Sequence, residues 1–152
     1  MDQKNHKISG QATETRENSV GWMFNMLGQS TNKVMKKKLA ALGLTQSQFT
    51  ILMTLFESDG ISQTEIGKRV MMPGYATTRN IDGLEERGLL KRAADSHSRR
   101  SYSILVTEDG WDLAPKLFTV VAEVNASLLD CLRKDEIDQL TKLLNKLVKT
   151  AA

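Results

Sequence analysis

The sequence predicts a mainly α-helical fold with one small β-hairpin, and three features support this. From Val20 onward, apolar residues recur at intervals of three and four, as on one side of amphipathic helices. Two helix-start signatures, Thr45-Gln-Ser-Gln48 and Ser62-Gln-Thr-Glu65, follow each other closely. Two short apolar-rich segments, 89–92 and 101–106, enclose a polar turn with paired arginines. Helices therefore make up most of the predicted fold, and the hairpin is its predicted sheet.

The composition excludes several classes of protein. With 152 residues, the chain can form one domain with a real core. No apolar run approaches the roughly 18 residues of a membrane span, and the polar segment 1–16 lacks the core of a signal peptide. Cys131 is the only cysteine, which excludes an internal disulfide and a thiolate-rich metal site. We therefore expect a cytoplasmic protein without a metal or a cofactor.

An enzyme is not expected. The sequence has no nucleophile motif and no glycine-rich phosphate loop. Its two histidines, His6 and His97, are far apart in unlike contexts, so they do not suggest a catalytic or metal-binding set.

The two ends of the chain are predicted to form long helices. Residues 1–17 have few apolar side chains and are expected to form a flexible arm, and residues 18–43 a long helix that Gly43 ends. Residues 107–152 are expected to form two further helices, the second beginning at Asp135. These helices carry more apolar surface than one small domain can cover. We therefore expect them to be dimerisation helices that pack against a second copy of the chain.

The middle of the chain, residues 44–106, has a distinctive order of predicted elements. A short capped helix, 62–69, is separated by a break at 72–74 from a second helix, 75–87, and the hairpin follows. Helix, turn, helix and a hairpin with a basic tip is the layout of a winged helix-turn-helix. That layout places one helix in the DNA major groove and the hairpin, or wing, beside it.

Charge is unevenly distributed along the chain. The segment 62–102 contains eight basic and five acidic side chains, and so accounts for the whole net charge of +3. A nucleic-acid-binding module is expected to concentrate positive charge in this way.

The second helix of this module is predicted to read DNA bases. Gly74, Tyr75, Thr78 and Arg79 form a thin polar start that fits a groove about 12 Å wide. Arg79 could donate two hydrogen bonds to guanine; alternatively, it pairs with a neighbouring carboxylate on a solvated helix. The complete set of predicted DNA-binding residues is Ser62, Thr64, Gly74, Tyr75, Thr77, Thr78, Arg79, His97, Arg99 and Arg100.

The tip of the wing is predicted to contact the minor groove. Arg99 and Arg100 are adjacent cations on a hairpin, and a narrow minor groove has a strongly negative potential. Asp95 is expected to brace the wing by pairing with Arg99. His97 could add a pH-sensitive contact or could be a solvated turn histidine.

These segments resemble the MarR family of bacterial transcriptional regulators. The resemblance is carried by residues 63–69, 78–92 and 95–100, by the run 105–110 that follows, and by 43–49 before them. It implies a homodimeric winged-helix protein that binds a palindromic operator as a repressor, and that a small aromatic ligand could release. Two alternatives stay open: a winged-helix module that binds proteins rather than DNA, and a regulator that senses oxidation through its cysteine.

Two further sites can be interpreted in two ways. Trp22, Met26, Met53 and Trp111 could line an effector cleft, or they could be ordinary core residues at helical spacing. Cys131 could sense oxidation near a dimer interface, or it could be an inert thiol packed in an apolar stretch, since reactive thiols need accessible, cationic surroundings.

Overall fold

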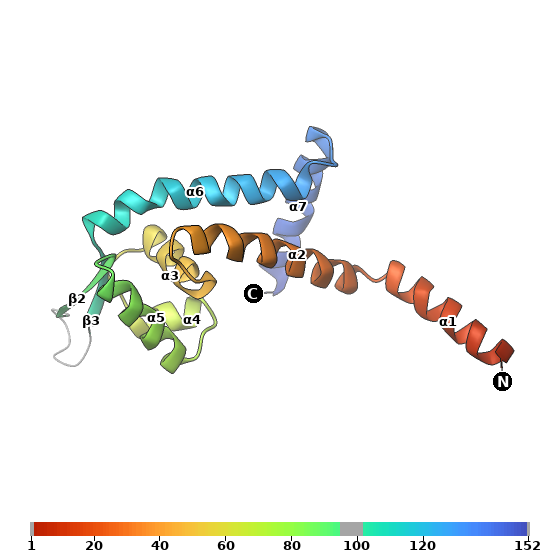
Figure 1. Cartoon of the computed structure of the whole chain (residues 1–152), viewed down its shortest axis with the longest axis horizontal. Coiled ribbons are helices and arrows are strands. Elements are labelled where there is room, and N and C mark those ends of the chain that lie inside the picture. The colour runs from red at the N-terminus through yellow and green to blue at the C-terminus, as the bar shows by residue number, and fades with distance from the viewer. Residues whose placement is uncertain (1, 95–101, 152) are drawn as a thin grey trace.

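The computed structural model describes residues 2–94 and 102–151, with the side chains of residues 5–94 and 102–150. Seven helices and three short strands follow one another within these residues (Figure 1). They are α1 (Asp2–Glu17), α2 (Val20–Ala41), α3 (Gln46–Glu57), β1 (Ile61–Ser62), α4 (Gln63–Arg69), α5 (Gly74–Glu86), β2 (Leu90–Ala94), β3 (Tyr102–Val106), α6 (Glu108–Leu129) and α7 (Lys134–Ala151). The predicted mainly helical fold with a β-hairpin is confirmed.

The sheet has one strand more than predicted. Strands β2 and β3 form the expected antiparallel hairpin, and β1 pairs with the other edge of β3 through Ile61 and Ile104. With two residues, β1 is too short to show an alternating pattern in the sequence. The loop before it is held by Asp59, whose carboxylate accepts a hydrogen bond from the Val106 amide at 2.9 Å.

The core lies where α3, α4 and α5 meet the sheet, α2 and α6. In Figure 1, α6 lies along α2 in the opposite direction, above the three short helices. Gly110 in the first turn of α6 allows this packing, because a Cβ there would lie 2.3 Å from the Leu89 carbonyl oxygen. The fully buried large side chains are Leu39, Ile51, Leu52, Leu55, Ile66, Ile81, Leu84, Leu90, Ile104, Leu117 and Thr77.

The N-terminal segment is helical, and the flexible arm predicted for residues 1–17 stays a prediction. Within 2–17 there is no proline and one glycine, so few residues oppose a helix. The hydroxyls of Thr13 and Thr15 donate to carbonyl oxygens four residues earlier, at 3.1 and 2.8 Å. Helix α1 still extends away from the rest of the chain, and its described side chains are exposed (Figure 1).

The two predicted helix-start signatures have different outcomes. At α3 the complete capping box is confirmed: Thr45 accepts from the Gln48 amide, and the Gln48 side chain accepts from the Thr45 amide. At α4, Ser62 accepts from the Glu65 amide as predicted. The Glu65 carboxylate, however, pairs with Arg69 at 2.9 Å instead of returning to the cap. An ion pair one turn along the same helix competes with the reciprocal bond.

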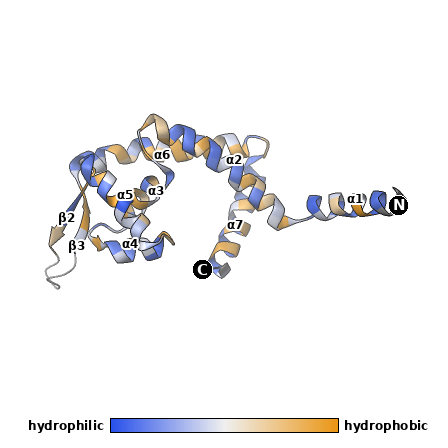
Figure 2. Ribbon diagram, turned by 60° about the horizontal axis from the view of Figure 1, so that its bottom comes forward, coloured by the Kyte–Doolittle hydropathy of each residue, from blue (hydrophilic) through white to orange (hydrophobic). Residues whose placement is uncertain are grey.

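Helix α7 packs little against its own chain. Its residues are exposed or half-buried throughout the described part, including the apolar side chains Leu143, Leu147 and Val148. Figure 2 shows hydrophobic residues along α2, α6 and α7 as well as among the short helices α3, α4 and α5. A single chain leaves these apolar faces exposed.

None of the described helices is by itself long and apolar enough to cross a membrane. Helices α2 and α3 reach the length and apolar composition of a membrane span only when taken together, and the chain bends by 82° at the break between them.

Candidate nucleic-acid interface

Helix α5 turns a polar ridge outward and anchors its other side in the core. Ile81 and Leu84 are fully buried, whereas Tyr75 is 80% exposed and Arg79 is also exposed. The assignment of Thr77 to DNA is wrong, because this side chain is fully buried. Its hydroxyl lies 3.1 Å from the Pro73 carbonyl oxygen, to which it donates. Thr77 therefore holds the start of the helix and cannot touch DNA.

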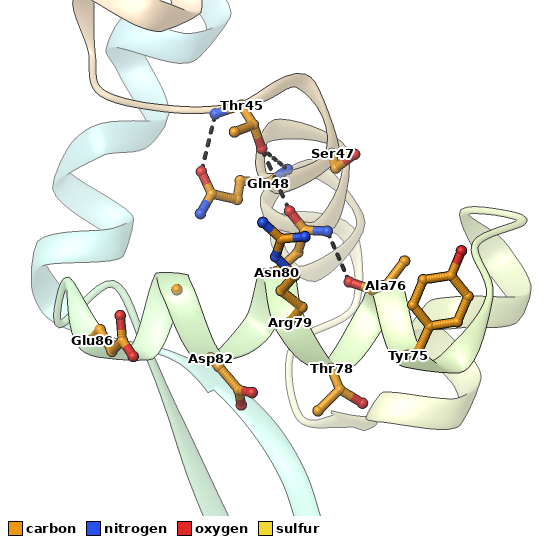
Figure 3. A pocket seen from close by; sticks show the side chains of 11 residues that line it. Thr45, Ser47, Gln48, Tyr75, Ala76, Thr78, Arg79, Asn80, Asp82 and Glu86 are labelled. Atoms are coloured by element: carbon orange, nitrogen blue, oxygen red, sulfur yellow. Dashed lines mark hydrogen bonds between the residues drawn. The ribbon is translucent and has the colours of Figure 1, made fainter.

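A hollow of about 900 Å³ separates α5 from the start of α3 (Figure 3). Asn80 lies in its wall, where its amide donates to the Ala76 carbonyl at 2.8 Å and its oxygen lies 3.5 Å from the Thr45 hydroxyl. In Figure 3 the Arg79 side chain extends toward the α3 side of the hollow, and Thr78 and Asp82 extend toward the other side. The lining residues are Thr45, Ser47, Gln48, Tyr75, Ala76, Thr78, Arg79, Asn80, Asp82, Gly83 and Glu86.

On its other flank, α5 packs against α4. The Gln63 amide donates to the Thr78 hydroxyl at 2.5 Å, and this hydroxyl donates to the Gly74 carbonyl at 2.9 Å. Thr64 on α4 is exposed, and the Ser62 oxygen is already used as the cap of that helix. Of the predicted residues, Thr64, Gly74, Tyr75, Thr78 and Arg79 thus come from two adjacent helices, and Ser62 ends β1 directly before α4.

The alternative partners of Arg79 are engaged by another cation. Arg92 on β2 donates to Asp82 at 2.5 Å and also to Glu85, so that it joins the base of the wing to α5. Burial lowers the pKa of Arg92, but the hydrogen bond to Asp82 and the charge of Glu85 raise it by a larger amount. The pKa of Arg92 therefore lies above its usual value. No ion pair joins Arg79 to another described residue. Its guanidinium is therefore available to a ligand.

A second arginine joins α5 to the long helix α2. Arg87, at the C-terminal end of α5, donates to the carbonyl oxygens of Gly43 at 2.6 Å and Leu42 at 3.1 Å. Gly43 has a φ of 67°, a conformation that suits glycine and ends the helix there. The roles of Arg87 and Arg92 were not predicted, because no local pattern indicates contacts with residues so distant in the sequence.

The predicted wing-tip residues Asp95, His97, Arg99 and Arg100 lie outside the described residues. The described strands of the wing end at Ala94 and resume at Tyr102, which is 58% exposed. The DNA contacts of the tip stay a prediction from the sequence.

The predicted effector residues do not come together. Trp22 and Met26 lie in the first half of α2, whereas Trp111 begins α6 at the opposite end of the α2–α6 pair (Figure 1). Trp111 packs instead against Phe56, with ring centroids 5.2 Å apart, and Met53 is half-buried on α3. Within one chain the four residues therefore do not line one cleft, because residues at helical spacing on different helices need not face one cavity.

The interpretation of Cys131 as a packed thiol is also wrong. Cys131 lies in the turn between α6 and α7 and is exposed. Its apolar neighbours Leu128, Leu129 and Leu132 are half-buried, and α6 ends at Leu129, two residues before it.

Comparison with known proteins agrees with this architecture. A sequence model described as MarR family matches residues 42–101. A MarR transcriptional regulator from Methanosarcina mazei Go1 is 26% identical, with a TM-score of 0.81 over 87% of this chain and 95% of that chain. A mutant MarR from E. coli is 24% identical, with a TM-score of 0.79 over 86% of this chain and 96% of that chain. A mutant MarR from E. coli complexed with operator DNA is 23% identical, with a TM-score of 0.75 over 88% and 96%.

The matched segment begins at the end of α2 and contains the helix-turn-helix and the first strand of the wing. The solved structures extend the likeness to most of the chain. Residues 42–101 therefore match the MarR family, and the chain has the winged-helix fold of these structures.

Proposed function

We propose that this protein is a cytoplasmic transcriptional regulator that binds a palindromic DNA operator as a homodimer and acts as a repressor. The observation that carries the proposal is the exposed first half of α5, where Tyr75 and Arg79 stand free beside Thr78. An arginine in this position can donate two hydrogen bonds to the major-groove edge of guanine. The operator DNA bound by the E. coli MarR relative supports a similar ligand for this chain.

The charges along α5 indicate which half of the helix enters the groove. The first half carries Arg79 and no acidic residue, whereas Asp82, Glu85 and Glu86 lie in the second half. Arg92 pairs with Asp82 and Glu85 and offsets one of their two negative charges, and Glu86 is exposed and would repel phosphates. The helix should therefore enter the groove with its N-terminal half and leave its C-terminal half outside.

The proposed dimer rests on apolar surface that one chain leaves exposed. Phe24 and Leu27 on α2 are 45% and 50% exposed, Phe118 on α6 is 50% exposed, and Leu143 and Leu147 on α7 exceed 50%. Monomeric soluble proteins rarely expose apolar side chains in such a continuous group. A second copy would cover these faces. The two α5 helices of the dimer, one from each copy, would then reach half-sites about 34 Å apart.

The resemblance also implies release of DNA by a small ligand. The four residues predicted for this purpose share no cavity, so the proposal is restricted to DNA binding and dimerisation.

The proposal is tested by selecting bound sequences from a random DNA pool and measuring affinity for the selected site. We expect a palindrome with half-sites about one helical turn apart. Arg79→Ala should weaken binding to that site by about 1–3 kcal/mol per half-site and relax the base preference. Arg133→Ala is the matched control, because Arg133 is exposed at the start of α7 and paired with Asp135 and Glu136. Equal affinity of the Arg79 variant and wild type would contradict the assignment of α5.

A further inference from the structure

A second unbalanced positive segment lies outside the winged helix. Between Glu17 and Glu57 the sequence contains no acidic residue, and its four lysines all lie on α2. Lys38 has a carboxylate partner, Glu123 on α6, at 2.5 Å. The other three, Lys33, Lys36 and Lys37, are exposed and form no ion pair with a described residue; we call them the basic strip.

The basic strip lies on the exposed side of α2, and its member Lys36 lies nearest to the start of α3. The Gln46 side chain donates to Asn32 at 2.7 Å, which places Asn32 at this corner of the molecule. Lys36 follows Asn32 by one helical turn on the same side of α2, and Lys33 is adjacent to it. Lys38, two residues after Lys36, lies on the opposite side of the helix.

This corner borders the proposed DNA-reading surface. Ser47, next to Gln46, lines the hollow beside α5 together with Arg79. When a helix enters the major groove, one phosphate backbone passes along each of its flanks. On the α4 flank Thr64 is exposed. On the α3 flank the hollow extends from Arg79 to Ser47, and the neighbouring Gln46 contacts Asn32, one turn before Lys36 on α2.

Stabilisation of α2 does not explain the three lysines. A cation near the C-terminus of a helix interacts favourably with the helix dipole, but the effect is confined to the last turn. Only Lys38 lies in the last turn of α2. An ordinary solvated helix surface would also be expected to carry acidic residues among the basic ones, and α2 has none.

We propose that the basic strip binds DNA phosphates on the α3 flank of the recognition helix, and so extends the contacts of each protomer toward the centre of the operator. This inference rests on the proposed function. Lysine is suited to the role, since its ammonium group is a compact charge on a long flexible stem and needs no fixed geometry. The contacts carry no base specificity, so they raise affinity for every sequence.

The test is the salt dependence of binding, measured by fluorescence anisotropy on the selected operator. Each phosphate that a lysine neutralises contributes about 0.9 to the slope of log affinity against log salt. In K33A/K36A/K37A, each protomer should neutralise at least one phosphate fewer, so the slope for the dimer should fall by at least about 1.8. The selected sequence should stay the same. Alanine favours helix, so the variant should keep its α2 helix, which circular dichroism verifies.

Single substitutions give the matched control. Lys36→Ala and Lys38→Ala remove the same charge from the same helix, but on opposite sides. We expect the slope to fall for Lys36→Ala and to stay unchanged for Lys38→Ala, whereas equal slopes for the two would overturn the inference. If the wild type binds DNA and the triple variant has the same salt slope as the wild type, only the proposed role of the basic strip is overturned. A wild-type protein that binds no DNA would overturn the proposed function as well.

Discussion

Replacing Arg92 with methionine would remove the cation that joins the wing to the recognition helix while keeping most of its apolar stem. The Arg92 side chain is 23% exposed, and its partners Asp82 and Glu85 are 48% and 37% exposed. Because both carboxylates are partly solvated, we assign each pair about 0.5–1 kcal/mol rather than the value of a buried pair. Loss of both pairs, about 1–2 kcal/mol, should lower the Tm of a protein of this size by roughly 2–8 °C.

The same substitution should also weaken DNA binding, because each protomer loses one positive charge beside α5. Asp82 and Glu85 would keep their negative charges on α5 without this partner. At a separation of about 8 Å in water, a cation and a phosphate attract each other by about 0.5 kcal/mol. Loss of two cations in a dimer then costs about 1 kcal/mol, or roughly a 5-fold loss of affinity.

Two variants separate these effects. Arg92→Met and the triple variant R92M/D82N/E85Q would be compared by thermal denaturation and by anisotropy titration with the operator. The triple variant should regain most of the DNA affinity, since its amides do not repel phosphates, but it should not regain thermal stability. If both variants bound DNA equally, the change in charge beside α5 would be refuted as the cause.

Three other substitutions test the packing and the assembly. Gly110→Ala places a Cβ 2.3 Å from the Leu89 carbonyl oxygen and should destabilise the fold by about 1–3 kcal/mol in urea unfolding, whereas an unchanged midpoint would contradict the close packing. Thr45→Ala removes the cap of α3 and should cost about 1 kcal/mol in the same assay, and no loss would mean that the cap is redundant. Leu147→Glu should convert the dimer into a monomer in light scattering, whereas Asn145→Glu on the same helix should not; a dimeric Leu147 variant would exclude α7 from the interface.

The start of the third helix shows what local sequence can predict. The pattern Thr45-Gln-Ser-Gln48 satisfies the free amides of a helix start by itself, and the structure has both bonds. The end of α2 at Gly43 is similarly local, because the residue takes a positive φ. Such features depend on neighbours a few residues away, so the sequence contains all the information that they need.

Contacts between distant segments could not be predicted in this way. Nothing near Arg92 or Arg87 in the sequence indicates that one would neutralise Asp82 and the other would reach Gly43. Thr77 shows the same limit: its residue type suits a DNA contact, but the rotation of α5 in the core buries it. For Trp22 and Trp111, helical spacing predicted an apolar face but could not indicate which cavity that face would meet.

By itself, the sequence determined the helices from Val20 onward, the hairpin and the concentration of positive charge in the segment 62–102, because periodicity, caps and charge are properties of neighbouring residues. The tertiary structure alone decided that Arg79 is left without a carboxylate partner among the described residues and that Asn32, one turn before Lys36, meets the start of α3. The physical reason is that both outcomes depend on which charges the folded chain brings together. Hydrophobic burial sets that arrangement across the whole domain, and no single stretch of sequence encodes it.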